Sequence, residues 1–350
     1  MNMMSNTSNT KFKSIQVLRG CGALSVALYH CNVYLINMGG NEKTIFKVFN
    51  EFFSYGAILF FAISGYLMAS SINNSSGNKT FLVKRLARIY PSYILTVIMV
   101  VFIKVSLFSS ITQPDLLKSI TLLPFGVIVY PLGVEWTLIY EIFFYFVCWP
   151  FNYERFKDFF SRFLLLWMLI ILITSLKFNL QTSFLPTINN IFFAVFNFAF
   201  IFGGLFYYLN QKMPIKSLKL TYIIIIINLI VIYIVGYYSK TITFFGRISY
   251  FIFGIGFSCI IYAMINNERI SNINYNKYII ALGDYSYGLY LIHVPVITII
   301  FSLFSKAIST NLASIIGIIA IILSLVAGVI IGRIDVLLNI NIINFLNKKM

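Results

Sequence analysis

The chain has 350 residues, of which 59% are hydrophobic and only 10% are charged, and its mean hydropathy is +0.88. A soluble domain has about a quarter charged residues, so this composition excludes an ordinary soluble protein and predicts a polytopic membrane protein. The 26 basic and 10 acidic residues give a net charge of +16. In a membrane protein such an excess of basic residues indicates topology rather than nucleic-acid binding.

Apolar runs predict about ten membrane-spanning helices. In chain order they cover residues 14–36, 52–72, 90–110, 134–151, 163–178, 191–209, 220–238, 248–265, 279–304 and 312–332. Only short loops separate them, so we predict one all-α integral membrane domain over residues 1–350, with tails at 1–13 and 333–350. No small-residue cleavage site follows a short apolar core, so the first span is expected to be a retained anchor. The second tail has the composition of a short interfacial helix.

Basic residues orient this predicted bundle. With the N-terminus inside, the inner tails and loops hold 17 basic residues and the outer loops hold 7. Cytoplasmic segments carry the excess of Lys and Arg in membrane proteins. We therefore expect both termini in the cytoplasm and an even number of spans.

Small residues inside the apolar runs indicate packing. The stretch FFAISGYLM at residues 60–68 and the pair Gly203–Gly204 would allow helices to approach closely. The cysteines lie in or beside apolar runs without CxxC spacing, so neither a disulfide framework nor a metal site is expected. They are Cys21, Cys31, Cys148 and Cys259.

The first predicted span carries two titratable residues, Arg19 and His30. Eleven steps of about 100° place them on one helix face, and the rise per residue separates them by roughly 16 Å. Arg19 would then lie near the inner surface and His30 in the outer part of the span. Arg19 could be a snorkelling arginine and His30 a hydrogen-bonded interior residue. Two such groups on one face of a span indicate function, and histidine can accept a proton near neutral pH.

A basic cluster precedes the third predicted span. Lys84, Arg85 and Arg88 lie at its cytoplasmic end. Arg85 and Arg88 are three positions apart, so on a helix they share a face and could bind phosphates in bidentate fashion. Ordinary positive-inside charge is the alternative.

The fourth predicted span begins with the stretch GVEWTLIYEIFFYF. Glu141 falls at the same depth as His30 and could orient its imidazole, as in other acid–base pairs. Lys104 in the third span lies at a similar depth, so a Glu141–Lys104 pair is an alternative. Trp136 is either part of the substrate region or an interfacial belt residue.

The ninth predicted span contains a polar stripe. Ser286, Tyr290 and His293 follow helical spacing, with His293 near mid-membrane and Pro295 a potential kink. The stripe would face the substrate, or it would hydrogen-bond to neighbouring helices as packing.

Together these stretches resemble the acyltransferase-3 family of integral membrane acyltransferases, over nearly the whole chain. IQVLRGCGALSVALYH is similar to the family's Arg-x10-His first helix, and FFAISGYLM to its second-helix signature. KRLARIYP is similar to the cytoplasmic RxxR motif, EWTLIYE to the Trp-[Ser/Thr]-Leu-x-x-Glu segment, and SYGLYLIHVP to the SYSLYLIHxP segment.

The resemblance implies transfer of an acyl group, usually acetyl, from cytoplasmic acyl-CoA to a hydroxyl of a surface polysaccharide or its lipid-linked precursor. It implies His30 as the essential catalytic histidine and Arg19, Arg85 and Arg88 as the CoA-side arginines. Some members carry a fused extracytoplasmic esterase-like domain. Residues 1–350 contain none, so a separate extracytoplasmic protein could complete the transfer. The expected location is the inner membrane of a bacterium.

Residues and resemblance lead to one mechanistic hypothesis. The CoA phosphates would meet the arginines at the inner surface, and the thioester would approach His30. His30 would deprotonate the acceptor hydroxyl, with Glu141 as its orienting carboxylate, while a route through an acyl-His30 stays open. The expected partners are acyl-CoA, a carbohydrate or glycolipid acceptor and the bilayer, without metal or nucleic acid. A transporter or flippase for a lipid-linked sugar or anionic solute is the alternative from another class.

Overall fold

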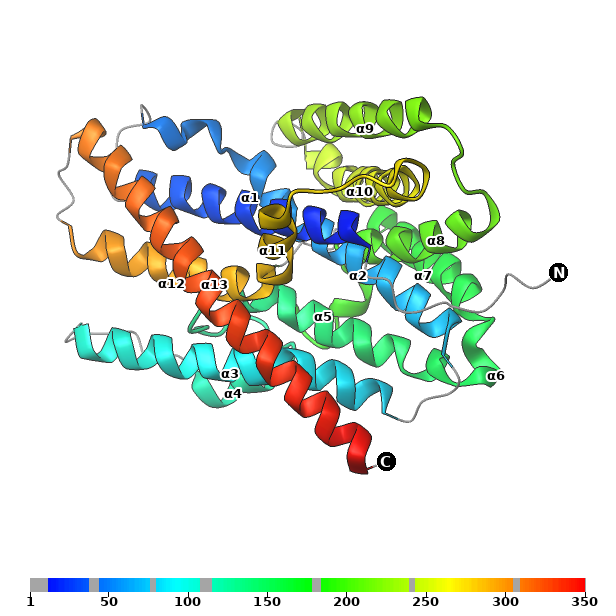
Figure 1. The fold of residues 1–350 in the computed structure, drawn as a ribbon, viewed down its shortest axis with the longest axis horizontal. Helices are drawn as coiled ribbons and strands as arrows, with labels where there is room; N and C mark the ends of the chain where they lie inside the picture. The colour runs from blue at the N-terminus through cyan, green and yellow to red at the C-terminus, as the bar shows by residue number, and fades with distance from the viewer. Residues whose placement is uncertain are drawn as a thin grey trace.

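The computed structural model describes residues 12–37, 44–75, 80–107, 115–177, 184–238, 243–304 and 309–349. Within these ranges the regular structure is helical (Figure 1). The α-helices are α1 Lys13–Asn37, α2 Gly56–Asn73, α3 Phe81–Leu107, α4 Leu116–Thr121, α5 Glu135–Cys148, α6 Glu154–Lys157, α7 Phe160–Lys177, α8 Asn197–Lys212, α9 Leu218–Tyr238, α10 Thr243–Ser271, α11 Lys277–Asp284, α12 Ser286–Ser302 and α13 Thr310–Lys349. Short 3₁₀ helices are η1 Ile45–Val48, η2 Glu51–Tyr55, η3 Pro150–Asn152 and η4 Ile191–Phe193.

Each predicted span overlaps a helix of the described chain, namely α1, α2, α3, α5, α7, α8, α9, α10, the α11–α12 pair and α13. The predicted span at 191–209 begins in η4 and a short non-helical stretch before α8. Residues 108–110 and 178, at the ends of two predicted spans, lie outside the described residues. By length and composition, 5 helical segments of the described chain could each cross a membrane, or 6 if the bent α11–α12 pair is one span. The prediction of an all-α membrane bundle is therefore confirmed. The number of spans and the cytoplasmic position of both termini stay predictions.

Helix α1 lies in the middle of the bundle and carries the two titratable residues of the first span. It packs against α2, α10, α11, α12 and α13. Its N-terminus is fixed by Glu268 of α10, whose carboxylate oxygens accept from the backbone N–H of Lys13 at 3.0 Å and of Ser14 at 2.8 Å. A carboxylate in this position satisfies helix N–H groups that have no partner within the helix and complements the helix dipole.

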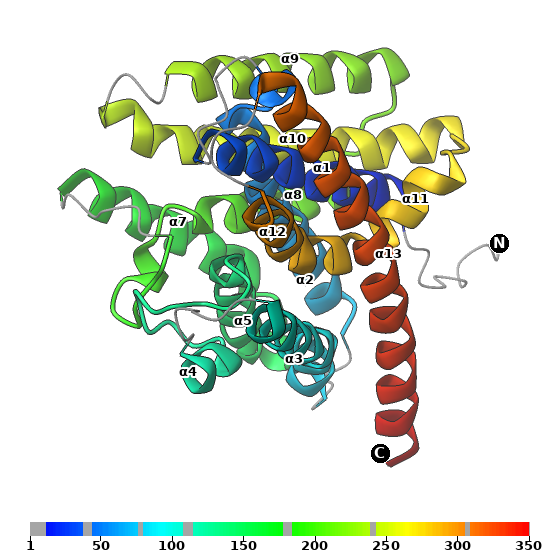
Figure 2. The same cartoon turned by 90° about the vertical axis from the view of Figure 1, so that its left-hand side faces the viewer.

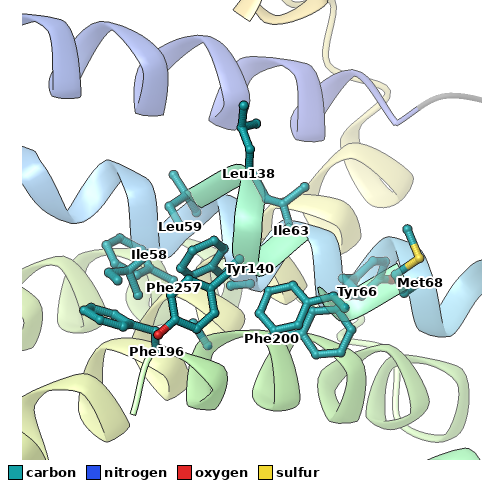
Figure 3. Close-up of a cluster of buried hydrophobic side chains, with 14 of the residues drawn as sticks. Ile58, Leu59, Ile63, Tyr66, Met68, Leu138, Tyr140, Phe196, Phe200 and Phe257 are labelled. Atoms are coloured by element: carbon teal, nitrogen blue, oxygen red, sulfur yellow. The ribbon is translucent and has the colours of Figure 1, made fainter. Parts of the chain in front are cut away.

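The core between the helices is rich in aromatic side chains. Figure 3 shows part of it, where Ile63 and Tyr66 of α2 lie near Tyr140 of α5 and Phe200 of α8. Helices α2 and α8 approach closely, as the small residues predict. A Cβ at Gly65 would overlap the Phe200 carbonyl, so glycine is required at this crossing.

The ninth predicted span is broken rather than continuous. Its two parts, α11 and α12, meet at 71° around Tyr285. Pro295, where a kink was expected, lies inside α12. Gly283 precedes the bend and packs so closely on α1 that a Cβ would overlap the Gln16 carbonyl. Ser286 Oγ closes the bend by donating to the Gly283 carbonyl at 2.7 Å.

The predicted tail at 333–350 is not a separate helix. Helix α13 continues without a break from Thr310 to Lys349, a length of 40 residues. A helix of this length extends roughly 60 Å, about twice the thickness of the hydrocarbon core. Its C-terminal part therefore projects beyond the other helices (Figures 1 and 2).

Candidate active site

Two histidines from distant parts of the chain meet between α1 and α12. The Nε2 atom of His293 lies 3.1 Å from the Nδ1 atom of His30. The two ring centroids are 5.1 Å apart. His293 is fully buried, whereas His30 is half-buried. We call these two residues the histidine pair.

Backbone carbonyls of the same two helices hold both rings. His30 Nδ1 lies 3.1 Å from the carbonyl oxygen of Val26, and His293 Nδ1 lies 3.1 Å from that of Leu289. Each carbonyl belongs to the residue four positions earlier, so helix geometry alone brings ring and acceptor together. The contacts fix how each imidazole is turned.

Tyrosine side chains surround the histidine pair. The ring centroids of Tyr29 and Tyr34 lie 5.2 and 6.3 Å from that of His30. Tyr290 lies 5.6 Å from His293, and its hydroxyl accepts from Thr137 Oγ1 of α5 at 2.8 Å. The predicted polar stripe is therefore divided: His293 belongs to the histidine pair and Tyr290 contacts it, whereas Ser286 closes the bend at the start of α12.

The arginines form a second polar region, toward the N-terminal end of α1. Arg19 interacts electrostatically with Arg88 of α3, and Arg88 also interacts with Arg85. All three are half-buried. The carboxylates of Glu141 in α5 and Asp335 in α13 balance Arg19. We call these five residues the arginine cluster.

Aromatic residues support the arginine cluster. The guanidinium of Arg85 lies 5.5 Å from the ring centroid of Phe81 and 6.0 Å from that of Tyr145. Such contacts are attractive because the ring face is electronegative. Tyr287 of α12 interacts electrostatically with Glu141 and donates its hydroxyl to the Ile89 carbonyl at 2.9 Å.

Glu141 does not lie where equal depth along straight spans placed it. Its carboxylate accepts from the Tyr145 hydroxyl at 2.6 Å and interacts with Arg19, three turns from His30 along α1. Lys104 instead donates to the Pro131 carbonyl at 3.2 Å and interacts with Glu135. Among the described contacts, the imidazole partner of His30 is His293, and neither expected pairing of Glu141, with His30 or with Lys104, is present. Depth within a span does not determine how neighbouring helices are tilted and rotated.

Asp335 is a site residue that the sequence reasoning missed. It is 3% exposed, and it accepts from Ser92 Oγ of α3 at 2.7 Å. Its carboxylate also interacts with Arg88 and Arg19. The sequence-based prediction places this residue in a cytoplasmic tail, although an acid within an apolar helix is itself a signal of a buried polar site.

At the start of α5, Trp136 packs against other aromatic rings and Glu135 hydrogen-bonds to backbone N–H groups. The Trp136 ring packs at 5.9 Å from Phe61 and 5.4 Å from Phe196. The buried Glu135 carboxylate accepts from the backbone N–H of Leu132 at 2.7 Å and of Val134 at 2.9 Å. These contacts fix the turn that leads into α5.

The two polar regions are joined by α1, with Arg19 at one and His30 at the other, roughly 16 Å apart along the helix. One region offers fixed positive charge for an anionic ligand, and the other offers imidazole nitrogens for proton transfer. The sequence model of a family described as an acyltransferase domain matches residues 12–333. No curated protein and no solved structure matches the chain significantly.

Proposed function

The chain belongs to the acyltransferase-3 family of membrane acyltransferases, and from this premise we propose that it transfers an acyl group, most simply acetyl, from cytoplasmic acyl-CoA to a hydroxyl of a surface polysaccharide or its lipid-linked precursor. The observation that carries the proposal is that α1 joins the arginine cluster to the histidine pair. A donor with phosphates at one end and a thioester at the other fits such a division.

The arginine cluster is the proposed site for the CoA phosphates. Arg19, Arg85 and Arg88 bring three cations together from α1 and α3, and Arg guanidinium groups bind phosphate in bidentate fashion. Each of the three side chains keeps a minor part of its surface exposed, through which a ligand could reach it. The carboxylates of Glu141 and Asp335 would balance part of this positive charge when the ligand is absent.

His30 is the proposed general base. The pantetheine arm would extend from the arginine cluster along α1, so that the thioester approaches the histidine pair. His30 would take the proton of the acceptor hydroxyl as the oxygen attacks the thioester carbonyl. Glu141 then acts in donor binding, through Arg19, instead of orienting His30.

The acceptor and the location are part of the same proposal. A surface glycan or glycolipid would present its hydroxyl from the outer part of the span, where His30 is expected to lie. An extracytoplasmic partner protein could complete the transfer, and the bacterial inner membrane is the proposed location. Both termini would then lie in the cytoplasm, on the side of the donor.

The test uses purified protein in lipid nanodiscs with radiolabelled acetyl-CoA. The expected result is release of free CoA, with the labelled acetyl group recovered either as acetate or on an added glycan acceptor. Comparing the acyl content of surface glycans by mass spectrometry, in cells with and without the gene, identifies the acceptor. A protein that neither binds nor consumes acyl-CoA, but moves a lipid-linked sugar or an anion, would overturn the proposal in favour of a transporter.

A further inference from the structure

The contacts of the histidine pair determine where its protons lie. The Leu289 carbonyl can only accept, so the His293 Nδ1 atom facing it at 3.1 Å carries a hydrogen. A neutral imidazole has one N–H, which leaves His293 Nε2 as an acceptor. The nitrogen that it meets at 3.1 Å, His30 Nδ1, must then donate. That hydrogen also faces the Val26 carbonyl at 3.1 Å, so all the contacts are satisfied together.

The reverse direction fails on the same contacts. If His293 Nε2 donated to His30 Nδ1, the lone pair of His30 Nδ1 would face the Val26 carbonyl oxygen. In the neutral ring the lone pair of His293 Nδ1 would also face the Leu289 oxygen. Two acceptors placed against each other in a buried site leave both unsatisfied, which is costly.

A charged His293 is disfavoured for a different reason. In the part of the chain that the structure describes, the groups that interact with it are His30 and the backbone carbonyls of Leu289 and Tyr290. His30 in turn interacts with the Val26 carbonyl. Among these described groups, a resting imidazolium would therefore be a buried charge balanced by carbonyl dipoles and by no carboxylate.

We propose that His293 is the positioning residue of the reaction: it accepts from His30 Nδ1–H and so leaves the lone pair of His30 Nε2 free to act as the base. The assignment of His30 as the base rests on the proposed function, whereas the direction of the hydrogen bonds does not. His293 thereby takes the part that a carboxylate takes in other histidine dyads. A neutral imidazole does so without placing a charge in the membrane.

The chemical step balances with these groups alone. The acceptor O–H gives its proton to His30 Nε2 while its oxygen bonds to the thioester carbon. The C–S bond breaks, and the CoA thiolate leaves and takes that proton from Nε2, which restores the neutral pair. Between these transfers the His30 imidazolium donates from Nδ1 to His293 Nε2, so two rings share one positive charge.

Substitutions at 293 separate this role from packing. His293→Gln keeps an acceptor near the position of Nε2, whereas His293→Leu keeps volume without one. We expect the Leu variant to lose about 10²–10⁴ in kcat, with the KM for acetyl-CoA within about two-fold, and the Gln variant to recover at least about ten-fold of that loss. Thr298→Val, one turn further along α12, is the matched control because the described hydrogen bonds of Thr298 go to carbonyls of its own helix. Equal kcat in the Gln and Leu variants, or a normal kcat in the Leu variant, would overturn the proposal.

A spectroscopic test needs neither activity nor a folded variant. The chain has only 2 histidines, so ¹⁵N-histidine labelling of wild-type protein, without a histidine tag, reports on this pair alone. We expect both neutral rings to be protonated at Nδ1 and unprotonated at Nε2. A neutral His30 protonated at Nε2 would overturn the proposal. The expected tautomers in a protein that transfers no acyl group would support the hydrogen-bond direction and overturn only the proposed function.

Discussion

The arginine cluster and the histidine pair are both built on α1, but they hold their polar groups in opposite ways. In the arginine cluster, half-buried cations from α1 and α3 face carboxylates from α5 and α13. In the histidine pair, each imidazole contacts the other and a carbonyl of its own helix. Cations that are paired with carboxylates and keep part of their surface exposed suit the binding and release of an anion. Two imidazole rings in contact, with a fixed proton order, suit a proton transfer.

The largest effect is expected for His30, whose loss should lower turnover without affecting the binding of CoA at the arginine cluster. His30→Ala should lower the turnover of acetyl-CoA with the native acceptor by about 10²–10⁴, or more if an acyl-His30 forms, because a general base acts on the barrier. CoA binding, measured by calorimetry, should stay intact because the arginine cluster is unchanged. Ser25→Ala is the matched control, since the described hydrogen bond of Ser25 goes to the Gly22 carbonyl within α1. Near-normal turnover in a folded His30→Ala protein would contradict the assignment.

The converse test removes the donor-side cations. Arg85→Ala and Arg88→Ala should each weaken CoA binding by roughly 10- to 100-fold, because charge-assisted bonds to phosphate contribute about 1.5–3 kcal/mol. The kcat at saturating acetyl-CoA should change little. Lys replacements should restore binding only in part, since Lys lacks the planar fork. Arg155→Ala, an exposed basic residue of α6, is the control. If Arg85→Ala and Arg88→Ala both bound CoA as well as the wild-type protein, the two arginines would act only as topology signals.

A packing change should affect both regions together. Helix α12 carries His293 and α13 carries Asp335, and the two helices meet at Gly288, where a Cβ would overlap the backbone of Gly328 and Gly332. Gly288→Ala should cost about 1–3 kcal/mol of stability through overpacking. A lower Tm in detergent should accompany losses in both CoA affinity and turnover. An unchanged Tm would show that the two helices separate without cost.

The smallest effect is expected at Asp335. Asp335→Asn keeps an acceptor for Ser92 but removes a negative charge beside Arg19 and Arg88. CoA binding should become about two- to five-fold tighter at low salt, and the gain should shrink as salt is added. Calorimetry at two salt concentrations measures both. Weaker binding instead would mean that Asp335 holds the arginines in place more than it competes with phosphate.

Much of this architecture follows from local patterns in the sequence. Hydropathy predicted where the helices lie, because a segment surrounded by lipid must be apolar and must satisfy its backbone internally. Helical spacing placed Arg19 and His30 on one face, and the motifs indicated the family that the sequence model then matched. These inferences concern single segments, for which periodicity and composition are sufficient.

The partners of the site residues were decided by tertiary structure. His30 and His293 are 263 positions apart, and no spacing rule relates the rotation of α12 to that of α1. The bend at Tyr285 and the close approach at Gly283 set that rotation. Likewise, the tilt of α5 brings Glu141 to Arg19, and the unbroken course of α13 carries Asp335 into the bundle. Sequence determines which face of a helix a side chain occupies, but helix packing determines which side chain it meets, because crossing angles arise from contacts along the whole interface.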